Sequence, residues 1–166
     1  MIDLSGLHRH SGIRKLSDPD TDSILELCAG NTQFYQYCGA GPSKEQILND
    51  LHITPPGIDP ADKYYIGFYQ EDVLIAVMDL IDGYPEPDIA FIGFFMIRRE
   101  LQGNRVGSEI IRETAAYLKT IGKTAIRLGI DKDNPQSTHF WRKNGFLVIQ
   151  EIDRDGWTVL LAEKAL

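Results

Sequence analysis

The residues best suited to chemistry lie in a basic, glycine-containing turn past the middle of the chain. The turn reads Gln102-Gly103-Asn104-Arg105-Val106-Gly107-Ser108 and follows an apolar run at residues 92–97. A turn of this kind between a strand and a helix leaves main-chain N–H groups free and pointing one way, with the positive end of the helix dipole behind them. The segment is therefore suited to holding a phosphate group.

Three arginines crowd this turn, although the chain has a formal net charge of −7. Cations at the start of a helix oppose its dipole, so Arg98, Arg99 and Arg105 indicate an anion among them. Three solvated arginines on an ordinary loop would leave the same pattern. This segment alone does not separate the two interpretations.

Two segments, taken in order, resemble the acyl-CoA-binding signatures of the GNAT superfamily of N-acetyltransferases. Residues 102–107 resemble (Q/R)-x-x-G-x-(G/A), and residues 134–146, NPQSTHFWRKNGF, resemble N-x-x-A-x-x-F-Y-x-x-x-G-F. Either motif alone is weak, whereas the pair in this order is a strong signal. With the coarse order of helices and strands, the resemblance covers roughly residues 12–164.

The elements that must position these residues form one α/β domain. Periodicity and turn residues predict strands at 12–17, 63–69, 73–81, 89–97, 125–130, 146–152 and 157–161. Helices are predicted to start at Asp18, Ser43, Gly103 and Asn134, and the best of them spans residues 103–120. The resemblance implies the GNAT acyl-CoA N-acyltransferase fold, with a mixed, mostly antiparallel sheet of about six or seven strands and about four helices. We expect residues 1–11 to be a loosely held arm and residues 12–166 to be a single domain.

Composition narrows the class of protein. The 166 residues fit one domain, and no apolar run approaches membrane-spanning length. With no signal pattern at the N-terminus we expect a cytoplasmic protein. The acidic balance argues against nucleic-acid binding. Cys28 and Cys38 fit no metal spacing, and His8 and His10 lack a third ligand, so no metal is expected.

The resemblance implies acetyl-CoA as co-substrate and assigns residues to its parts. Main-chain N–H groups of the turn would hold the pyrophosphate, in the segment Gln102, Gly103, Asn104, Arg105, Val106, Gly107 and Ser108. The end of the central strand, Phe95, Met96 and Ile97, would contact the pantetheine arm, and an N–H near Phe95 would stabilise the oxyanion. Asn134 matches the family residue that reaches this arm, and it is equally a plain helix cap.

Two residues depart from the family pattern. Arg105 replaces the glycine at the fourth position of the first signature, which costs fit if that glycine allows close backbone approach. Trp141 stands where many relatives carry the tyrosine that protonates the departing thiolate. An indole N–H is far too weak an acid for this, although it can donate a hydrogen bond to sulfur. Tyr84 and His139 are the alternative candidates for the acid.

The acceptor amine must lose a proton, and carboxylates near the central strand could accept it. Asp79, Glu86 and Asp88 are candidates, and a water chain could replace all three. The aromatic segment with Phe34, Tyr35 and Tyr37, together with Tyr84, would line the acceptor site. A satellite hydrophobic cluster would explain the same aromatic residues.

The leading hypothesis is therefore an N-acetyltransferase that transfers an acetyl group directly to a small-molecule amine or an exposed amino group. The alternative is a non-catalytic acyl-CoA-binding module, in which Trp141 marks the lost acid. A different nucleotide binder ranks last, because the sequence has neither Gly-Lys-Ser/Thr nor the three-glycine dinucleotide spacing. A homodimer is plausible, because terminal strands often pair between protomers in the family it resembles.

Overall fold

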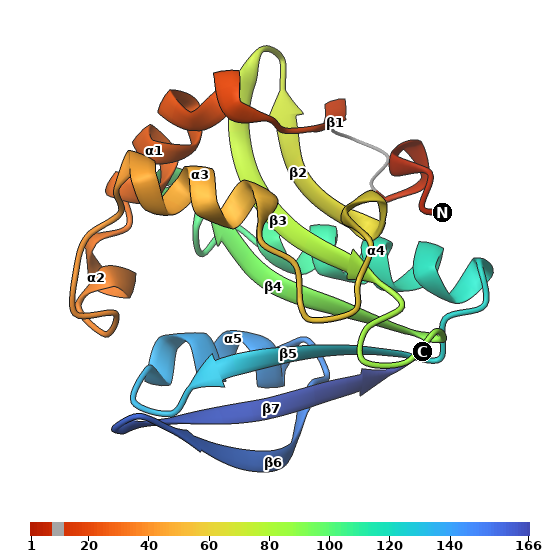
Figure 1. Ribbon diagram of the computed structural model, residues 1–166. Coiled ribbons are helices and arrows are strands. Elements are labelled where there is room, and N and C mark those ends of the chain that lie inside the picture. Colours follow the sequence, from red (N-terminus) through yellow and green to blue (C-terminus); the bar gives the residue numbers. More distant parts are fainter. Residues whose placement is uncertain (8–11) are drawn as a thin grey trace.

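A seven-stranded mixed sheet forms the centre of the molecule (Figure 1). The computed structural model describes residues 1–7 and 12–166. The strands are β1 (Gly12–Lys15), β2 (Lys63–Gln70), β3 (Val73–Asp82), β4 (Ile89–Ile97), β5 (Ala125–Asp131), β6 (Leu147–Arg154) and β7 (Trp157–Ala165). Their order across the sheet is β1-β2-β3-β4-β5-β7-β6. Among these strands β4 and β5 pair in parallel and all other neighbours are antiparallel, so the predicted fold class is confirmed.

Helices cover both faces of the sheet. They are α1 (Thr21–Ala29), α2 (Thr32–Tyr35), α3 (Lys44–His52), α4 (Val106–Thr120) and α5 (Pro135–Lys143). Side chains along a strand alternate between faces, so Ile66 belongs to one core cluster with Ile110 of α4, while Tyr65 belongs to the other with Ile24 of α1 and Ile47 of α3. Figure 1 shows α1 and α3 on the opposite side of the sheet from α4. No helix of the described chain is long and apolar enough to cross a membrane.

The parallel pair β4–β5 is short compared with β4 itself. Its register runs from Ile89 opposite Ala125 to Ile92 opposite Leu128, whereas β4 continues to Ile97. The two strands therefore separate over the second half of β4, and Figure 1 shows the β5–β7–β6 part of the sheet diverging from the rest.

The register between β3 and β4 determines where the main-chain groups of that second half point. Arg98 N donates to Ile75 O at 2.8 Å, and Phe95 lies opposite Met78 while Ile97 lies opposite Ala76. Because alternate residues of an antiparallel ladder bond to the partner strand, the N–H and C=O groups of Phe95 and Ile97 point away from β3. They face the gap that β5 leaves.

Two predicted helix starts are wrong by a few residues. The long helix begins at Val106 rather than Gly103, because Gly103 (φ 78°) and Arg105 (φ 64°) adopt left-handed backbone conformations that a helix cannot include. A 3₁₀ turn (Asp18–Asp20) precedes α1, and Asp18 is the first residue of this turn rather than the residue that caps it. Ser17 is the cap, and its backbone N–H donates to Asp20 Oδ2 at 2.9 Å.

The N-terminal arm is described only in part, since residues 8–11, with His8 and His10, lie outside the described residues. Residues 1–7 pack on the sheet. Ile2 and Leu7 are buried, and Ile2 N–H donates to the hydroxyl of Tyr64 at 3.1 Å. These contacts attach residues 2 and 7 of the predicted arm to the rest of the molecule.

Candidate functional site

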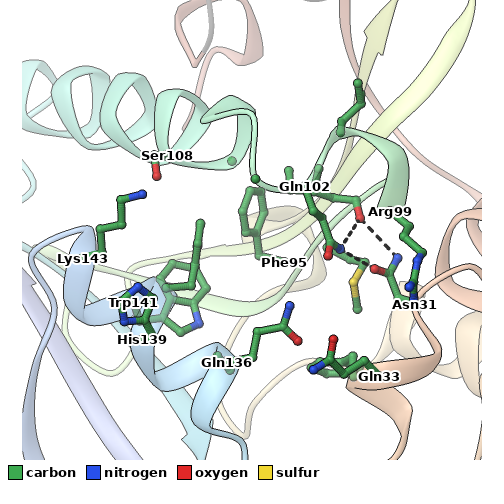
Figure 2. Close-up of a pocket in the computed structure, with 18 of the residues that line it drawn as sticks. Asn31, Gln33, Phe95, Arg99, Gln102, Ser108, Gln136, His139, Trp141 and Lys143 are labelled. Carbon is green, nitrogen blue, oxygen red and sulfur yellow. Dashed lines mark hydrogen bonds between the residues drawn. The ribbon is translucent and has the colours of Figure 1, made fainter.

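A cleft of about 460 Å³ opens where the end of β4, the start of α4 and the face of α5 meet (Figure 2). Most of the residues predicted to hold the cofactor line it. These are Phe95, Met96, Ile97, Gln102, Gly103, Arg105, Gly107, Ser108, Asn134 and Trp141, whereas Asn104 and Val106 are not among the lining residues. The cleft therefore joins two segments that lie about thirty residues apart in the chain.

One end of the cleft is built to hold an anion. The first α4 bond between main-chain groups runs from Glu109 N to Arg105 O at 3.0 Å, so the N–H groups of Val106, Gly107 and Ser108 have no acceptor within the helix. Arg105 and Lys143 add positive charge at this end, whereas Figure 2 shows Arg99 beside Asn31, away from Ser108 and Lys143. No carboxylate of the described residues lines the cleft. In Figure 2 the amine of Lys143 points towards Ser108. Free N–H groups, helix dipole and cations all favour phosphate here.

Gly107 and Arg105 illustrate two different demands on this turn. A Cβ on Gly107 would lie 3.2 Å from Ile97 Cγ1 and 3.2 Å from Phe140 Cε2, so glycine lets α4 approach β4 and α5 closely. Arg105 instead occupies a left-handed backbone conformation. This conformation is unfavourable for any residue with a side chain and carries no such penalty for glycine. The cost of replacing the signature glycine thus includes backbone conformation, and not only the close approach that the sequence suggested.

Aromatic rings form one wall of the cleft. Phe95 stacks on Phe140 at 6.0 Å between centroids and lies 5.9 Å from Trp141. Trp141 is only 7% exposed and packs edge-on against Phe146 at 5.0 Å. Trp141 is therefore a core residue as well as part of the cleft wall.

A partly buried amide network, not anticipated from the sequence, ties three parts of the site together (Figure 2). Asn31 Nδ2 donates to Leu27 O at 2.9 Å and to Ile97 O at 3.2 Å, and Gln102 Nε2 donates to Ile97 O at 3.1 Å. Gln102 Nε2 also donates to Asn31 Oδ1. The Ile97 carbonyl therefore already has two donors, which leaves the N–H of Ile97 and both main-chain groups of Phe95 as the groups facing the gap.

Helix α5 contributes more residues than sequence reasoning assigned to it. Asn134 Oδ1 caps the helix by accepting from Ser137 N at 3.0 Å, so the cap interpretation is confirmed, and Asn134 lines the cleft as well. Gln136, Ser137, His139, Phe140 and Lys143 also line it. Ser137 lies four residues before Trp141, as Gln136 does before Phe140, and this spacing could have revealed the face. His139 lies on the cleft too, although its offset from Trp141 suggested another direction.

Tyr84 and Glu86 do not lie at the cleft. Both belong to the connection between β3 and β4, at the start of β4, and the Tyr84 ring contacts Phe91 at 5.3 Å. Phe91 precedes Phe95 by four strand residues, which is about 13 Å. The connection before β4 thus places Tyr84, Glu86 and Asp88 away from the end of β4 where the cleft opens.

The aromatic segment before α3 is only partly at the cleft. Phe34 lines it and packs edge-on against Phe94 at 6.1 Å. Tyr35 packs against the cluster beneath α1 and α3, where burial raises the pKa of its hydroxyl. Tyr37 is half-buried and is not among the lining residues.

Asp79 is buried under α1 and α3 and does not line the cleft. Lys63 Nζ donates to both of its carboxylate oxygens at 2.8 Å. Burial raises the pKa of Asp79, and the bond from Lys63 opposes that rise. Among the described residues no group of three or more His, Cys, Asp or Glu side chains is placed to hold a metal ion.

Comparison with known proteins finds the same family along most of the chain. The model of the acetyltransferase (GNAT) family matches residues 28–146. The spermidine N(1)-acetyltransferase of Thermoplasma acidophilum is 25% identical in a match that covers 92% of this chain and 96% of that protein. An acetyltransferase from Thermus thermophilus has a TM-score of 0.76 at 19% identity and covers 94% of this chain and 97% of its own. The PaiA N-acetyltransferase of Thermoplasma acidophilum, solved in complex with coenzyme A, has a TM-score of 0.67 at 23% identity, with 94% and 99% covered.

Proposed function

Because the chain belongs to the acetyltransferase (GNAT) family and is an N-acetyltransferase, we propose that it transfers the acetyl group of acetyl-CoA directly to the amino group of a small amine. One observation carries the cofactor part of this proposal. The cleft presents three cations, a helix N-terminus and no described carboxylate, and it leads to an unpaired edge of β4. A ligand with phosphates at one end and amides at the other matches this order of groups.

The phosphates of acetyl-CoA would occupy the turn and its surroundings. The pyrophosphate would accept from the N–H groups of Val106, Gly107 and Ser108. A second cavity of about 590 Å³ adjoins the cleft, sharing Arg105, Ser108 and Lys143 with it. Arg112, Lys164 and one carboxylate, Glu109, also line that cavity, so cations outnumber anions where the adenosine end of the cofactor would lie.

The pantetheine arm would run along the free edge of β4. The N–H and C=O of Phe95 and the N–H of Ile97 face the gap and can pair with the two amides and with the thioester oxygen. The amine nitrogen attacks the thioester carbon, and the Phe95 N–H stabilises the resulting oxyanion. The C–S bond then breaks, so the products are the N-acetylated amine and CoA.

Proton transfers in this scheme go mainly through water. No described carboxylate lines the cleft, so the amine loses its proton to a water molecule rather than to a cleft-lining carboxylate. Trp141 lies beside Phe95 and would donate a hydrogen bond to the departing thiolate. A CoA thiol is acidic enough to leave with this help.

The acceptor is proposed to be an aliphatic amine, of the class that includes polyamines. The relative from Thermoplasma acidophilum is named for spermidine, and a net charge of −7 favours the approach of cationic amines over anionic acceptors. Phe34, which lines the cleft, would contact the alkyl part of such an acceptor.

Thiol release from acetyl-CoA in the presence of an amine panel tests the proposal, with CoA binding followed by calorimetry. Lys143→Glu should weaken CoA binding by about tenfold or more, because it reverses a charge at the phosphate end. Arg142→Glu is the matched control, since Arg142 is exposed on the same helix and lines neither cavity. CoA binding without thiol release for any amine would favour the non-catalytic alternative, and equal effects of the two variants would contradict the assigned phosphate site.

A further inference from the structure

Strand β4 carries a β-bulge at the point where it leaves β5. Asp79 of β3 lies opposite Phe94, but the next residue, Leu80, lies opposite Ile92. Gly93 is therefore an extra residue, and Gly93 and Phe94 together oppose Asp79. The last pair between β4 and β5, Ile92 with Leu128, immediately precedes this extra residue. The bulge thus coincides with the start of the gap that exposes the free edge of β4.

The side chain of Asp79 occupies the space that a side chain on Gly93 would need. A Cβ built on Gly93 would lie 2.7 Å from Asp79 Oδ2 and 3.3 Å from Asp79 Cγ. Real Cβ atoms do not approach an oxygen so closely, so residue 93 must be glycine as long as the carboxylate lies there. The carboxylate is packed directly on the backbone of the bulge.

Lys63 holds this carboxylate in place from the neighbouring strand. Its Nζ donates at 2.8 Å to both oxygens of Asp79, and the two side chains are 4% and 11% exposed. Tyr65, which lies opposite Asp79, places its ring 5.8 Å from the same Nζ. One buried contact chain therefore runs across three strands, from Lys63 on β2 through Asp79 on β3 to Gly93 on β4.

A buried ion pair of this kind contributes little net stability to the fold. Removing both charges from water costs about as much as their attraction returns, so an apolar pair of the same size would serve the fold equally well. The buried pair does provide a fixed geometry at the bulge. Phe95, whose N–H faces the gap, follows Gly93 by two residues.

We propose that the Lys63–Asp79 pair positions the oxyanion-stabilising N–H of Phe95 by fixing the bulge at Gly93. Asp79 is in this view a positioning residue that acts through the backbone, and not the base considered from the sequence. The inference rests on the proposed acetyl transfer and adds to it the residues that set its geometry.

Single and paired substitutions separate this role from that of a base. Lys63→Met and Asp79→Asn should each lower kcat by about tenfold to a hundredfold, with a much smaller change in the KM for acetyl-CoA, because a misaimed donor stabilises the transition state less. The double variant should be no slower than either single variant, since the pair acts as a unit and no unpaired buried charge remains. A base at Asp79 would instead make Asp79→Asn far slower than Lys63→Met and would remove the acidic limb of the pH–rate profile. That result would overturn the proposal.

Lys123→Met is the control for loss of another ion pair on β3, one whose carboxylate also lies 3.5 Å from the N-terminal ammonium of Met1. Lys123 pairs with Asp82, three residues further along β3, and these side chains are 11% and 9% exposed. Its substitution should lower the melting temperature without lowering kcat. An equal loss of kcat in Lys123→Met would mean that general destabilisation explains the effect, and would overturn the proposal.

A spectroscopic readout needs no acceptor. Acetyl-CoA labelled with ¹³C at the acetyl carbonyl should show a downfield shift on binding to the wild-type protein, because an aimed N–H polarises the carbonyl. Asp79→Asn and Lys63→Met should bind the labelled cofactor and lose most of this shift, and retention of the full shift would overturn the positioning role. If the wild-type protein shows the shift but acetylates no amine, the proposed function fails while the positioning role stands.

Discussion

At Arg105, the proposed phosphate binding and the backbone geometry favour different residues. The residue has φ of 64° just before the first turn of α4, and its side chain lines both the cleft and the adjoining cavity. A glycine would adopt this conformation without strain but would remove a cation from the phosphate end. Strain retained at such a position is typical of a residue kept for binding.

Arg105→Gly is therefore expected to stabilise the fold and weaken cofactor binding. Relief of the left-handed conformation should contribute about 1 kcal/mol, which for a domain of this size raises the melting temperature by about 2–4 °C. Loss of the cation should raise the Kd for CoA by about tenfold. Arg105→Ala is the control, since it removes the charge and keeps the strain. A rise in melting temperature with alanine as well would refute the conformational explanation.

At the scale of elements, Asn31 connects the end of α1 to the end of β4 and to the turn at residues 102–108. Asn31 is 4% exposed and bonds to Leu27, Ile97 and Gln102, which belong to these three segments. The next helix, α2, begins one residue later and carries Phe34 to the cleft. The network therefore ties the proposed acceptor side to the proposed cofactor side.

Asn31→Ala should loosen both sides at once. Removing a buried amide with three partners should cost about 1–3 kcal/mol of folding free energy, and the Kd for CoA should rise because Gln102 loses its acceptor at Asn31. Thermal unfolding and calorimetry measure the two effects. Thr32→Ala, at the exposed neighbouring position, should change neither. Lower stability with an unchanged Kd would show that the network supports the fold alone.

The whole molecule is acidic, yet the proposed cofactor is a polyanion. Arg105 and Lys143 place positive charge at one end of the cleft in a chain whose net charge is −7. Charges within about 10 Å dominate at physiological salt, because screening removes the contribution of more distant ones. The local cations should therefore decide whether electrostatics strengthens or weakens CoA binding.

The single domain over residues 12–166, the homodimer and the cytoplasmic location remain predictions.

Added salt should accordingly weaken CoA binding. The Kd for CoA should rise steadily between about 0.05 and 0.5 M KCl, because salt screens the attraction between phosphates and cations. Pantetheine, which has the same arm without phosphates, should bind more weakly and show almost no salt dependence. Tighter CoA binding at high salt would mean that repulsion from the net charge dominates, and would contradict the assigned phosphate site.

The sequence by itself determined the fold class and the segments that form the proposed phosphate end of the site. Residues 102–108 and the cap at Asn134 are local features, because dipole, glycine spacing and capping depend on neighbours in the chain. Trp141 lies on the helix that Asn134 caps, so its position is also a local feature. These features can be recognised in the sequence without knowing which strands pair.

Only the tertiary structure decided which distant residues meet. Asn31 reaches Ile97 and Gln102, Lys63 reaches Asp79, and Tyr84 and Glu86 remain at the far end of β4. Each of these outcomes depends on strand register, and a slip of one residue would turn every side chain to the other face. The bulge at Gly93 changes the register within β4 itself, and it is visible only once β3 and β4 are paired.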